Sequence, residues 1–259
     1  MAVDQALLDL VARPVLRIYQ WDAPTLSLGY FQAVRDCEQH AESRGCPVLR
    51  RSTGGGAILH DSELTYSLAF PATLNKAKSS EWYNLVHETV ADLLATHRLV
   101  AKLHPARPAD ATATAAHDRQ VDCHRTGGSP RREPFLCFQR RAEGDLILWP
   151  TREHGPSADQ VNGHKVLGSA QRKRDGAILQ HGSILFCQSR FAPQLLGIND
   201  FLVPERRCDR MEFGREFVDR LLYRFGWTGE SAELTAQERA LAVDFERERF
   251  SHPKWTSMR

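Results

Sequence analysis

Residues 50–61 read RRSTGGGAILHD, and this stretch constrains the fold more than any other part of the chain. Three adjacent glycines are costly to order, because glycine loses more backbone freedom on folding than any other residue. Exposed backbone N–H groups beside guanidinium groups are the components of a site for an anion or a carbonyl group. The stretch therefore predicts a hairpin whose turn, Gly54, Gly55 and Gly56, approaches a ligand closely. A plain glycine-rich surface loop is the simpler alternative.

Charged residues on both sides of the glycines add to this interpretation. Arg51 precedes them, and His60 follows them in a His-Asp pair. We expect Arg51 to hold the hairpin or an anionic end of a substrate. For His60, as for His181 further along the chain, the sequence leaves two roles open: moving protons or shaping a pocket.

Residues 163–183, GHKVLGSAQRKRDGAILQHGS, form a second informative stretch. A single lysine lies among small residues here, so that backbone and one cation can approach the same ligand. The stretch predicts two strands joined by a charged turn at 172–175, and a strand pair without a site is the alternative. If a site exists, its residues are expected to be Lys165, Gly168, Ser169, Ala170, His181 and Gly182.

The rest of the chain alternates helix and strand patterns. We expect helices at 3–12, 33–44, 81–98, 213–225 and 235–250, and strands within 15–28 and at 48–51, 57–60, 64–70, 135–138, 145–149 and 177–186. These elements predict an α+β fold in which a mixed β-sheet has flanking helices. We expect one domain over 1–259, with a catalytic core at 1–195 and a short helical extension at 196–259.

Composition excludes several classes of protein. The 34 basic and 32 acidic residues give a net charge of +2, which provides no overall field for nucleic acid. The first residues lack the basic segment of a signal peptide, and no apolar run is long enough to span a membrane. Six cysteines without a repeated spacing then favour free thiols in the cytoplasm.

Residues 104–134 have no periodicity and predict a mobile insertion, and a second loop is expected at 150–162. His117, Cys123 and His124 lie in the insertion. They lack the paired spacing of a zinc site, so we expect no metal there.

Together the two glycine-containing stretches resemble the superfamily of lipoate–protein ligases, biotin–protein ligases and lipoyl(octanoyl)transferases. The first stretch is similar to the signature of that superfamily: two arginines, two variable residues, three glycines and a later His-Asp. The second is similar to its lysine block, with an intact Gly-Ser-Ala-Gln run. MAVDQALL, WDAPTLSLGYFQ and HPKWTSMR extend the resemblance over nearly the whole chain. It implies a fold like that of class II aminoacyl-tRNA synthetases and biotin synthetases, and acyl transfer to a lysine of a carrier domain.

Two chemistries share this fold, and a cysteine distinguishes them. Ligases activate free lipoate or biotin with ATP, whereas octanoyltransferases take octanoate from acyl carrier protein through a cysteine thioester. Residues 134–148, PFLCFQRRAEGDLIL, resemble the cysteine segment of the single-domain octanoyltransferases. The resemblance implies that Cys137 is the nucleophile and that Lys165 holds the carbonyl oxygen. It also implies that Gly168, Ser169 and Ala170 supply backbone donors to the oxyanion. Nearby cations favour the thiolate form of a cysteine.

The expected reaction moves octanoate from octanoyl-acyl carrier protein to a lysine of lipoyl domains (E2 subunits) or of the glycine-cleavage H protein, and it needs no cofactor. One alternative is a lipoate–protein ligase that uses ATP and Mg²⁺. Another is an amidotransferase that moves octanoyl or lipoyl groups between carrier proteins. A third is a non-catalytic protein that only binds carrier domains. The sequence leaves the carrier protein and the oligomeric state open.

Overall fold

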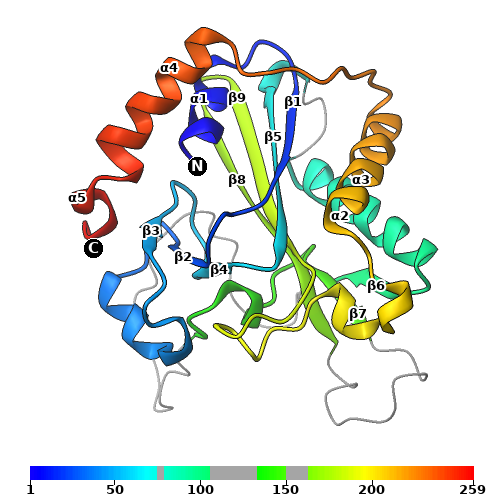
Figure 1. The fold of residues 1–259 in the computed structure, drawn as a ribbon. Helices are drawn as coiled ribbons and strands as arrows, with labels where there is room; N and C mark the ends of the chain where they lie inside the picture. Colours follow the sequence, from blue (N-terminus) through cyan, green and yellow to red (C-terminus); the bar gives the residue numbers. More distant parts are fainter. Residues whose placement is uncertain (75–78, 106–132, 150–162) are drawn as a thin grey trace, which may run out of the picture.

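The computed structural model describes residues 1–74, 79–105, 133–149 and 163–259, and its centre is an antiparallel sheet of six strands (Figure 1). The strand order is β1-β5-β9-β8-β7-β6. The bounds are β1 (Val15–Tyr19), β5 (Glu63–Pro71), β6 (Val100–Leu103), β7 (Leu146–Trp149), β8 (His164–Arg174) and β9 (Ala177–Leu185). The predicted strand pair at 163–183 is confirmed as the β8–β9 hairpin, in which Asp175 and Gly176 form the turn with positive φ angles of 47° and 78°.

Both faces of the large sheet are covered, so the central strand β5 is buried along nearly all its length. On one face, alternate β5 residues such as Leu64, Tyr66 and Leu68 pack against α2 and α3 in the main core. On the other face, Ala69 packs with Leu7 and Leu8 of α1. Figure 1 shows this arrangement, with α2 and α3 on one side of the sheet and α1 and α4 on the other. The helices are α1 (Ala2–Leu10), α2 (Ser79–Thr96), α3 (Arg210–Phe225), α4 (Ala236–Phe245) and α5 (Pro253–Thr256).

The helix ends follow the signals in the sequence. Gly226 ends α3 in the left-handed conformation, with φ of 66°. Thr235 and Glu238 form the predicted capping box at the start of α4. The expected helix at 235–250 divides, because α4 continues as a π-helical turn, η9 (Glu246–Phe250). Between its ends, α3 packs on the main core through Phe213, Phe217 and Leu221, which are buried there.

A second sheet of three strands contains the mixed pairing. Its order is β3-β2-β4, in which β2 (Thr25–Leu28) is parallel to β3 (Val48–Arg50) and antiparallel to β4 (Ile58–His60). The prediction of a hairpin across the glycines is therefore wrong. The two strands pair with opposite edges of β2, because Leu26 and Leu28 of β2 lie in a small core with Ala57 and Leu59. The glycine loop crosses the end of β2.

Two other predicted elements are also wrong. The expected helix at 33–44 is a pair of 3₁₀ turns, η1 (Val34–Gln39) and η2 (Ala41–Ser43). Its side chains are mostly polar, and it packs only Val34 and Cys37 against the small core, too little to stabilise an α-helix. The expected strand at 135–138 makes one bridge, between Ala57 and Leu136, before the 3₁₀ turn η4 (Cys137–Gln139).

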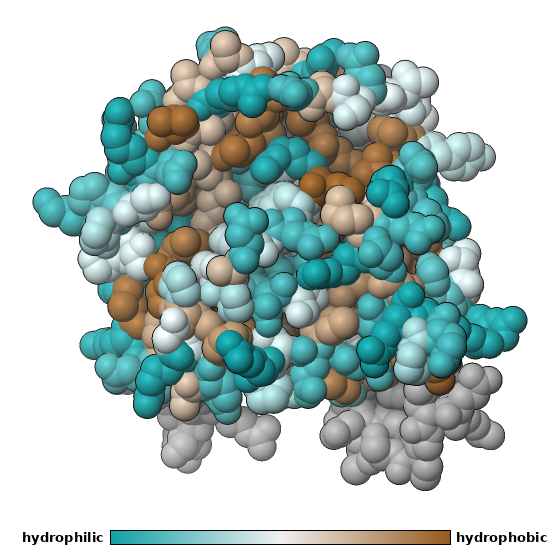
Figure 2. All heavy atoms as spheres, viewed as in Figure 1, coloured by the Kyte–Doolittle hydropathy of each residue, from teal (hydrophilic) through white to brown (hydrophobic). Residues whose placement is uncertain are grey.

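The short turns η3 (Ala72–Leu74), η7 (Ile198–Phe201) and η8 (Pro204–Arg206) complete the described elements. Most of the two expected loops, residues 106–132 and 150–162, lies outside the described residues. Hydrophilic residues cover much of the face in Figure 2, and hydrophobic ones gather in the upper part of the view between α4 and α3. Within the residues that the structure describes, no helix is long and apolar enough to cross a membrane.

Candidate active site

A cavity of about 290 Å³ lies where the two sheets meet the glycine loop. Residues from both stretches predicted from the sequence line it: Arg51, Gly54, Gly55, His60, Cys137, Gly168, Ser169, Ala170, His181 and Gly182. Gly56 and Lys165 lie just outside this lining and contact Cys137 instead. The remaining wall includes Met1, Tyr19, Trp21, Ile58 and Thr65, which the sequence did not single out.

Cys137 and Lys165 lie side by side, although 28 positions separate them in the chain. The Cys137 amide donates to the Ala57 carbonyl at 2.7 Å, which fixes the start of η4 against the small sheet. Lys165 comes from β8, and its Nζ is 3.9 Å from Cys137 Sγ and 3.4 Å from the Cys137 carbonyl oxygen. A thiol and an ammonium group at this distance can form a nucleophile with an adjacent cation.

Two glycines permit this contact. A Cβ atom added to Gly56 would lie 2.9 Å from the Cys137 amide nitrogen and 3.0 Å from its Cα. A Cβ atom on Gly168 would lie 2.5 Å from Lys165 Cε. Any side chain at either position would displace the cysteine or the lysine, so the missing side chains let backbone lie directly against the two reactive groups.

Arg51 holds the glycine loop and is itself buried. Its guanidinium donates to the carbonyl oxygens of Gly54 at 3.2 Å and Gly56 at 2.9 Å. It also donates to the carbonyl and the hydroxyl of Ser27, at 2.7 and 2.8 Å. Burial lowers the pKa of Arg51 to about 10, which leaves the group charged at neutral pH. Of the two roles expected for Arg51, these contacts correspond to holding the loop.

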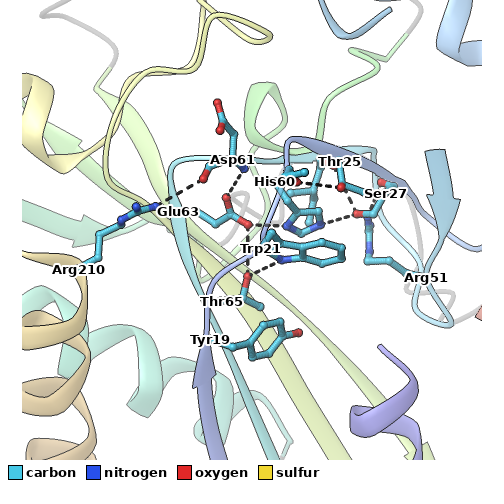
Figure 3. Close-up of polar contacts among 12 residues, drawn as sticks. Tyr19, Trp21, Thr25, Ser27, Arg51, His60, Asp61, Glu63, Thr65 and Arg210 are labelled. Carbon is cyan, nitrogen blue, oxygen red and sulfur yellow. Dashed lines mark hydrogen bonds and ion pairs between the residues drawn. The ribbon is translucent and has the colours of Figure 1, made fainter. Parts of the chain in front are cut away.

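His60 links this arginine to a buried acid (Figure 3). His60 Nδ1 lies 2.6 Å from Glu63 Oε1, and Nε2 lies 2.7 Å from Ser27 Oγ. The Asp61 amide and the Thr65 hydroxyl also donate to Glu63, so the carboxylate accepts from His60 as well. When the ring is neutral, Nε2 accepts from the Ser27 hydroxyl, which also lies 3.4 Å from the Ile58 carbonyl oxygen. Trp21 stacks on the imidazole with ring centroids 4.0 Å apart, and burial lowers the pKa of His60. The ring is therefore neutral, with both nitrogens in use, and shapes the pocket.

A second neutral histidine lies behind β8. His87 of α2 donates from Nδ1 to the Gly144 carbonyl at 2.8 Å, so Nε2 accepts from Ser169 Oγ at 2.6 Å. Ser169 Oγ in turn accepts from Tyr66 at 2.6 Å. Burial lowers the pKa of His87 to about 3. No sequence signal points to this contact, because His87 lies inside a regular helical pattern.

His181 faces the cavity from β9 and contacts the loop. Its Nε2 is 2.9 Å from Thr53 Oγ1, and burial lowers its pKa to about 4. His181 is thus neutral at physiological pH.

The backbone amides of residues 168–170 are expected to donate to the oxyanion, but each has another partner or points toward another strand. The Ser169 amide donates to the Tyr83 hydroxyl at 3.3 Å. Alternate amides of a strand point to opposite edges, so those of Gly168 and Ala170 face β9, with which both residues pair. Lys165 supplies a donor beside the sulfur.

An open groove of about 390 Å³ meets the cavity at Gly55, which borders both spaces. It is lined by Phe31, Gln32, Asp36, Gln39, Gly55, Glu133, Phe135 and Arg140. A Cβ atom added to Gly55 would lie 3.9 Å from Cys137 Sγ, so the groove opens close to the sulfur. The described residues contain no cluster of acidic, His or Cys side chains that could hold a metal ion, and His117, Cys123 and His124 lie outside them.

Solved structures similar to this fold include lipoate–protein ligases. A bi-partite lipoate protein ligase from Thermoplasma acidophilum, solved in a study that includes its E2 lipoyl domain, superposes with a TM-score of 0.67 at 18% identity. That match covers 99% of this chain and 89% of the other. Lipoate–protein ligase A bound with ATP gives a TM-score of 0.64 at 19% identity. This match covers 99% of this chain and 92% of the other. At these identities the likeness shows the fold, and the α+β prediction is confirmed.

Sequence comparisons identify the family. Residues 1–200 match the family model described as lipoyl protein ligase A/B catalytic domain. The octanoyltransferase LipM of Macrococcus caseolyticus is 31% identical over 256 residues, which cover 95% of this chain and 81% of that protein. LipM of Geobacillus kaustophilus is 29% identical, and the match covers 100% of this chain and 93% of that protein. LipM of Brevibacillus brevis is 34% identical over 193 residues, 71% of this chain and 60% of that relative. The chain therefore belongs to the lipoyl protein ligase A/B catalytic-domain family, among its octanoyltransferases, and is an acyltransferase.

Proposed function

We propose that this chain moves an octanoyl group from a carrier-protein thioester to a lysine of a lipoyl domain, through a thioester on Cys137. The observation that carries the proposal is the position of Cys137: it lines the cavity, and the Lys165 ammonium is 3.9 Å from its sulfur. Its octanoyltransferase relatives support the same acyl group.

In the first step, the Cys137 thiolate attacks the carbonyl carbon of the donor thioester. A new S–C bond forms, the old one breaks, and the carrier leaves as a thiol with the proton that Cys137 gave up. Thioester exchange of this kind needs no activation by ATP, so the proposed reaction uses no cofactor. The acyl chain lies in the cavity, against Ile58 and the ring of Trp21.

In the second step, the amine of the acceptor lysine attacks the acyl-cysteine. The amide bond forms as the S–C bond breaks, and the proton lost by the amine returns to the cysteine sulfur. Both steps pass through a tetrahedral oxyanion. Lys165 is the group that stabilises it, because its ammonium lies 3.9 Å from the sulfur.

The groove that meets the cavity at Gly55 gives both substrates a route to Cys137. Donor and acceptor use the same route in turn, which agrees with a ping-pong reaction, in which the first product leaves before the acceptor reacts. The proposed donor is octanoyl-acyl carrier protein, and the proposed acceptors are E2 lipoyl domains or the glycine-cleavage H protein. The study of a ligase with this fold also includes its E2 lipoyl domain, which supports the first of these acceptors.

Intact-mass measurement tests the proposal. The protein is incubated with octanoyl-acyl carrier protein without ATP, and we expect an octanoyl adduct that hydroxylamine removes. The Cys137→Ala variant should form none, and added lipoyl domain should take the group from the wild-type adduct. A wild-type protein that forms no adduct, but transfers lipoate when ATP and Mg²⁺ are added, would show that the chain is a ligase.

A further inference from the structure

Asp145 is the buried acid nearest to the proposed reacting groups. Its side chain is almost fully buried, and its Oδ2 is 2.7 Å from Lys165 Nζ. The Tyr83 hydroxyl donates to Oδ1 at 3.2 Å, and the Ala142 amide donates to Oδ2 at 2.7 Å. Burial raises the pKa of Tyr83, so its hydroxyl keeps the proton that it donates. Each carboxylate oxygen therefore accepts a hydrogen bond from a donor of fixed direction, and these two donors keep the carboxylate in one orientation.

The turn before β7 places this carboxylate. The Asp145 amide donates back to the Ala142 carbonyl at 3.1 Å, and the Gly144 amide donates to the His104 carbonyl at 2.9 Å. Gly144 has φ of 82°, and an added Cβ atom would lie 2.8 Å from both Asn84 Oδ1 and Tyr83 Cε1. The turn is thus packed directly against α2, which supplies the tyrosine.

The ammonium group of Lys165 has three protons to direct. One points to Asp145, and the Cys137 carbonyl oxygen and sulfur are the other two neighbours, at 3.4 and 3.9 Å. Without the carboxylate, a lysine on its flexible stem would have no fixed direction and would carry an unbalanced charge.

We propose that Asp145 is a positioning residue for acyl transfer: its carboxylate, oriented by Tyr83, aims the Lys165 ammonium at the Cys137 sulfur and balances its charge. The assignment rests on the proposed function of Cys137 and Lys165. Asp145 touches neither the sulfur nor the acyl group and acts only through the lysine.

Other charged and titratable groups also face Cys137, and the test must separate them from Asp145. Arg51 approaches from the glycine loop, with Nη2 3.7 Å from the position of a Gly55 Cβ atom. Arg140 follows η4 and is paired with Glu133. His87 on α2 and His181 on β9 are neutral. None of these four groups bonds the Asp145 carboxylate, whose partners are Lys165, Tyr83 and the Ala142 amide, so a substitution at Asp145 leaves their own hydrogen bonds and ion pairs in place.

Asp145→Asn keeps the shape and removes the charge. We expect two effects of opposite sign. Alkylation of Cys137 by iodoacetamide should extend to lower pH, with its midpoint falling by about one unit, because the uncompensated ammonium favours the thiolate. Acylation by octanoyl-acyl carrier protein should slow by about 100-fold, because the lysine is no longer aimed. A merely structural residue would slow both reactions together.

Three further variants complete the experiment. Asp145→Glu keeps the charge and should restore the wild-type alkylation midpoint. Tyr83→Phe removes one neutral donor, so acylation should fall by less than about tenfold with an unchanged midpoint. Asp92→Asn, on the exposed side of α2, is the matched control and should leave both measurements unchanged. If Asp145→Asn does not fold, Asp145→Glu decides the matter. It keeps the charge but displaces the carboxylate by one methylene group, so acylation should slow while the alkylation midpoint stays at the wild-type value. Acylation at the wild-type rate in Asp145→Glu would contradict the assignment.

The outcomes separate the inference from the proposed function. If the wild-type protein forms no acyl-Cys137, the proposed function is wrong. The alkylation midpoints then still show whether Asp145 balances the charge of Lys165. If the wild-type protein forms the adduct while Asp145→Asn keeps the wild-type midpoint and acylation rate, the role assigned to Asp145 is wrong.

Discussion

Buried polar side chains in this protein form chains of hydrogen bonds with a single direction. One runs from Arg51 through Ser27 and His60 to Glu63. Such a chain works only when the imidazole carries one proton, because a doubly protonated ring could not accept from the serine. His60 therefore connects the Glu63 carboxylate, through Ser27, to Arg51, which holds the glycine loop.

Replacing Ser27 by alanine tests this chain at its middle. The change leaves His60 Nε2 without a donor and removes one acceptor from Arg51, both in a buried place. We expect the free energy of unfolding to fall by about 1–3 kcal/mol in urea denaturation. Ser257→Ala is the control, because its hydroxyl is exposed and bonds only the Pro253 carbonyl. Equal stability of the two variants would contradict the single-direction chain.

At the scale of elements, the glycine loop positions the start of η4. The loop does not turn a hairpin; it connects two strands across β2 and lies against the backbone of Cys137. Each glycine has a different surrounding. Gly55 has φ of 94°, Gly56 is in close contact with Cys137, and an added Cβ atom on Gly54 would meet only the exposed Phe31 ring at 3.7 Å.

This difference gives a matched pair of variants. Gly56→Ala should reduce acyl transfer by about 100-fold, because its methyl group would push the Cys137 backbone away from the lysine by a fraction of an ångström or more. Gly54→Ala should retain activity within about threefold, since 3.7 Å is ordinary van der Waals contact. Steady-state rates with octanoyl-acyl carrier protein give the comparison. Similar losses in both variants would mean that the loop needs flexibility and not close approach.

Sequence reasoning succeeded where local signals decide an element. The β8–β9 turn at Asp175-Gly176 and the caps at Gly226 and Thr235 are all set by residues within a few positions. It failed for the strands on either side of the glycines. Which strand pairs with which depends on how the apolar faces meet in the folded core, and neighbouring positions carry no such information.

The same limit applies to the candidate site. Motif residues such as Gly55 and His181 could be found from the sequence, and the structure brings them to one cavity. Ser27, Tyr83 and His87 could not, because each lies in a regular strand or helix pattern and becomes special only through a contact at long range. Their roles are visible only when hydrogen-bond partners are known.

At the scale of the whole molecule, the far end of the chain supports the loop. Arg50 is fully buried and donates to the carbonyl oxygens of Gly29, Tyr30, Gln32, Trp255 and Thr256. Trp255 returns a hydrogen bond from its indole to the Arg50 carbonyl at 2.9 Å. The first arginine of the motif thus joins β3 and α5, and the second joins β2 and the glycine loop. Each donates to backbone carbonyl groups, and each thereby holds two segments of the chain together.

Buried neutral histidines make the stability of the whole fold depend on pH. Burial lowers the pKa of His60, of His87 to about 3 and of His181 to about 4, whereas histidine in the unfolded chain titrates near 6.5. Above pH 6.5 both states are neutral and the histidines contribute no pH dependence. Between pH 6.5 and 4 the unfolded chain binds protons that the folded protein does not. The free energy of unfolding must therefore fall as the pH falls, by up to about 1.4 kcal/mol per unit for each histidine.

Urea denaturation at pH 7.5, 6.5, 5.5 and 4.5 measures this slope. In the His181→Gln variant, the free energy of unfolding should fall less steeply with falling pH, by up to about 1.4 kcal/mol per pH unit. The variant lacks one of the histidines that stay neutral in the folded protein. Ser257→Ala is the control, since this residue is exposed and the change adds or removes no titratable group, and its slope should equal that of the wild type. Parallel lines for wild type and His181→Gln would mean that His181 takes up its proton in the folded state. The neutral ring assigned to the cavity wall would then be wrong.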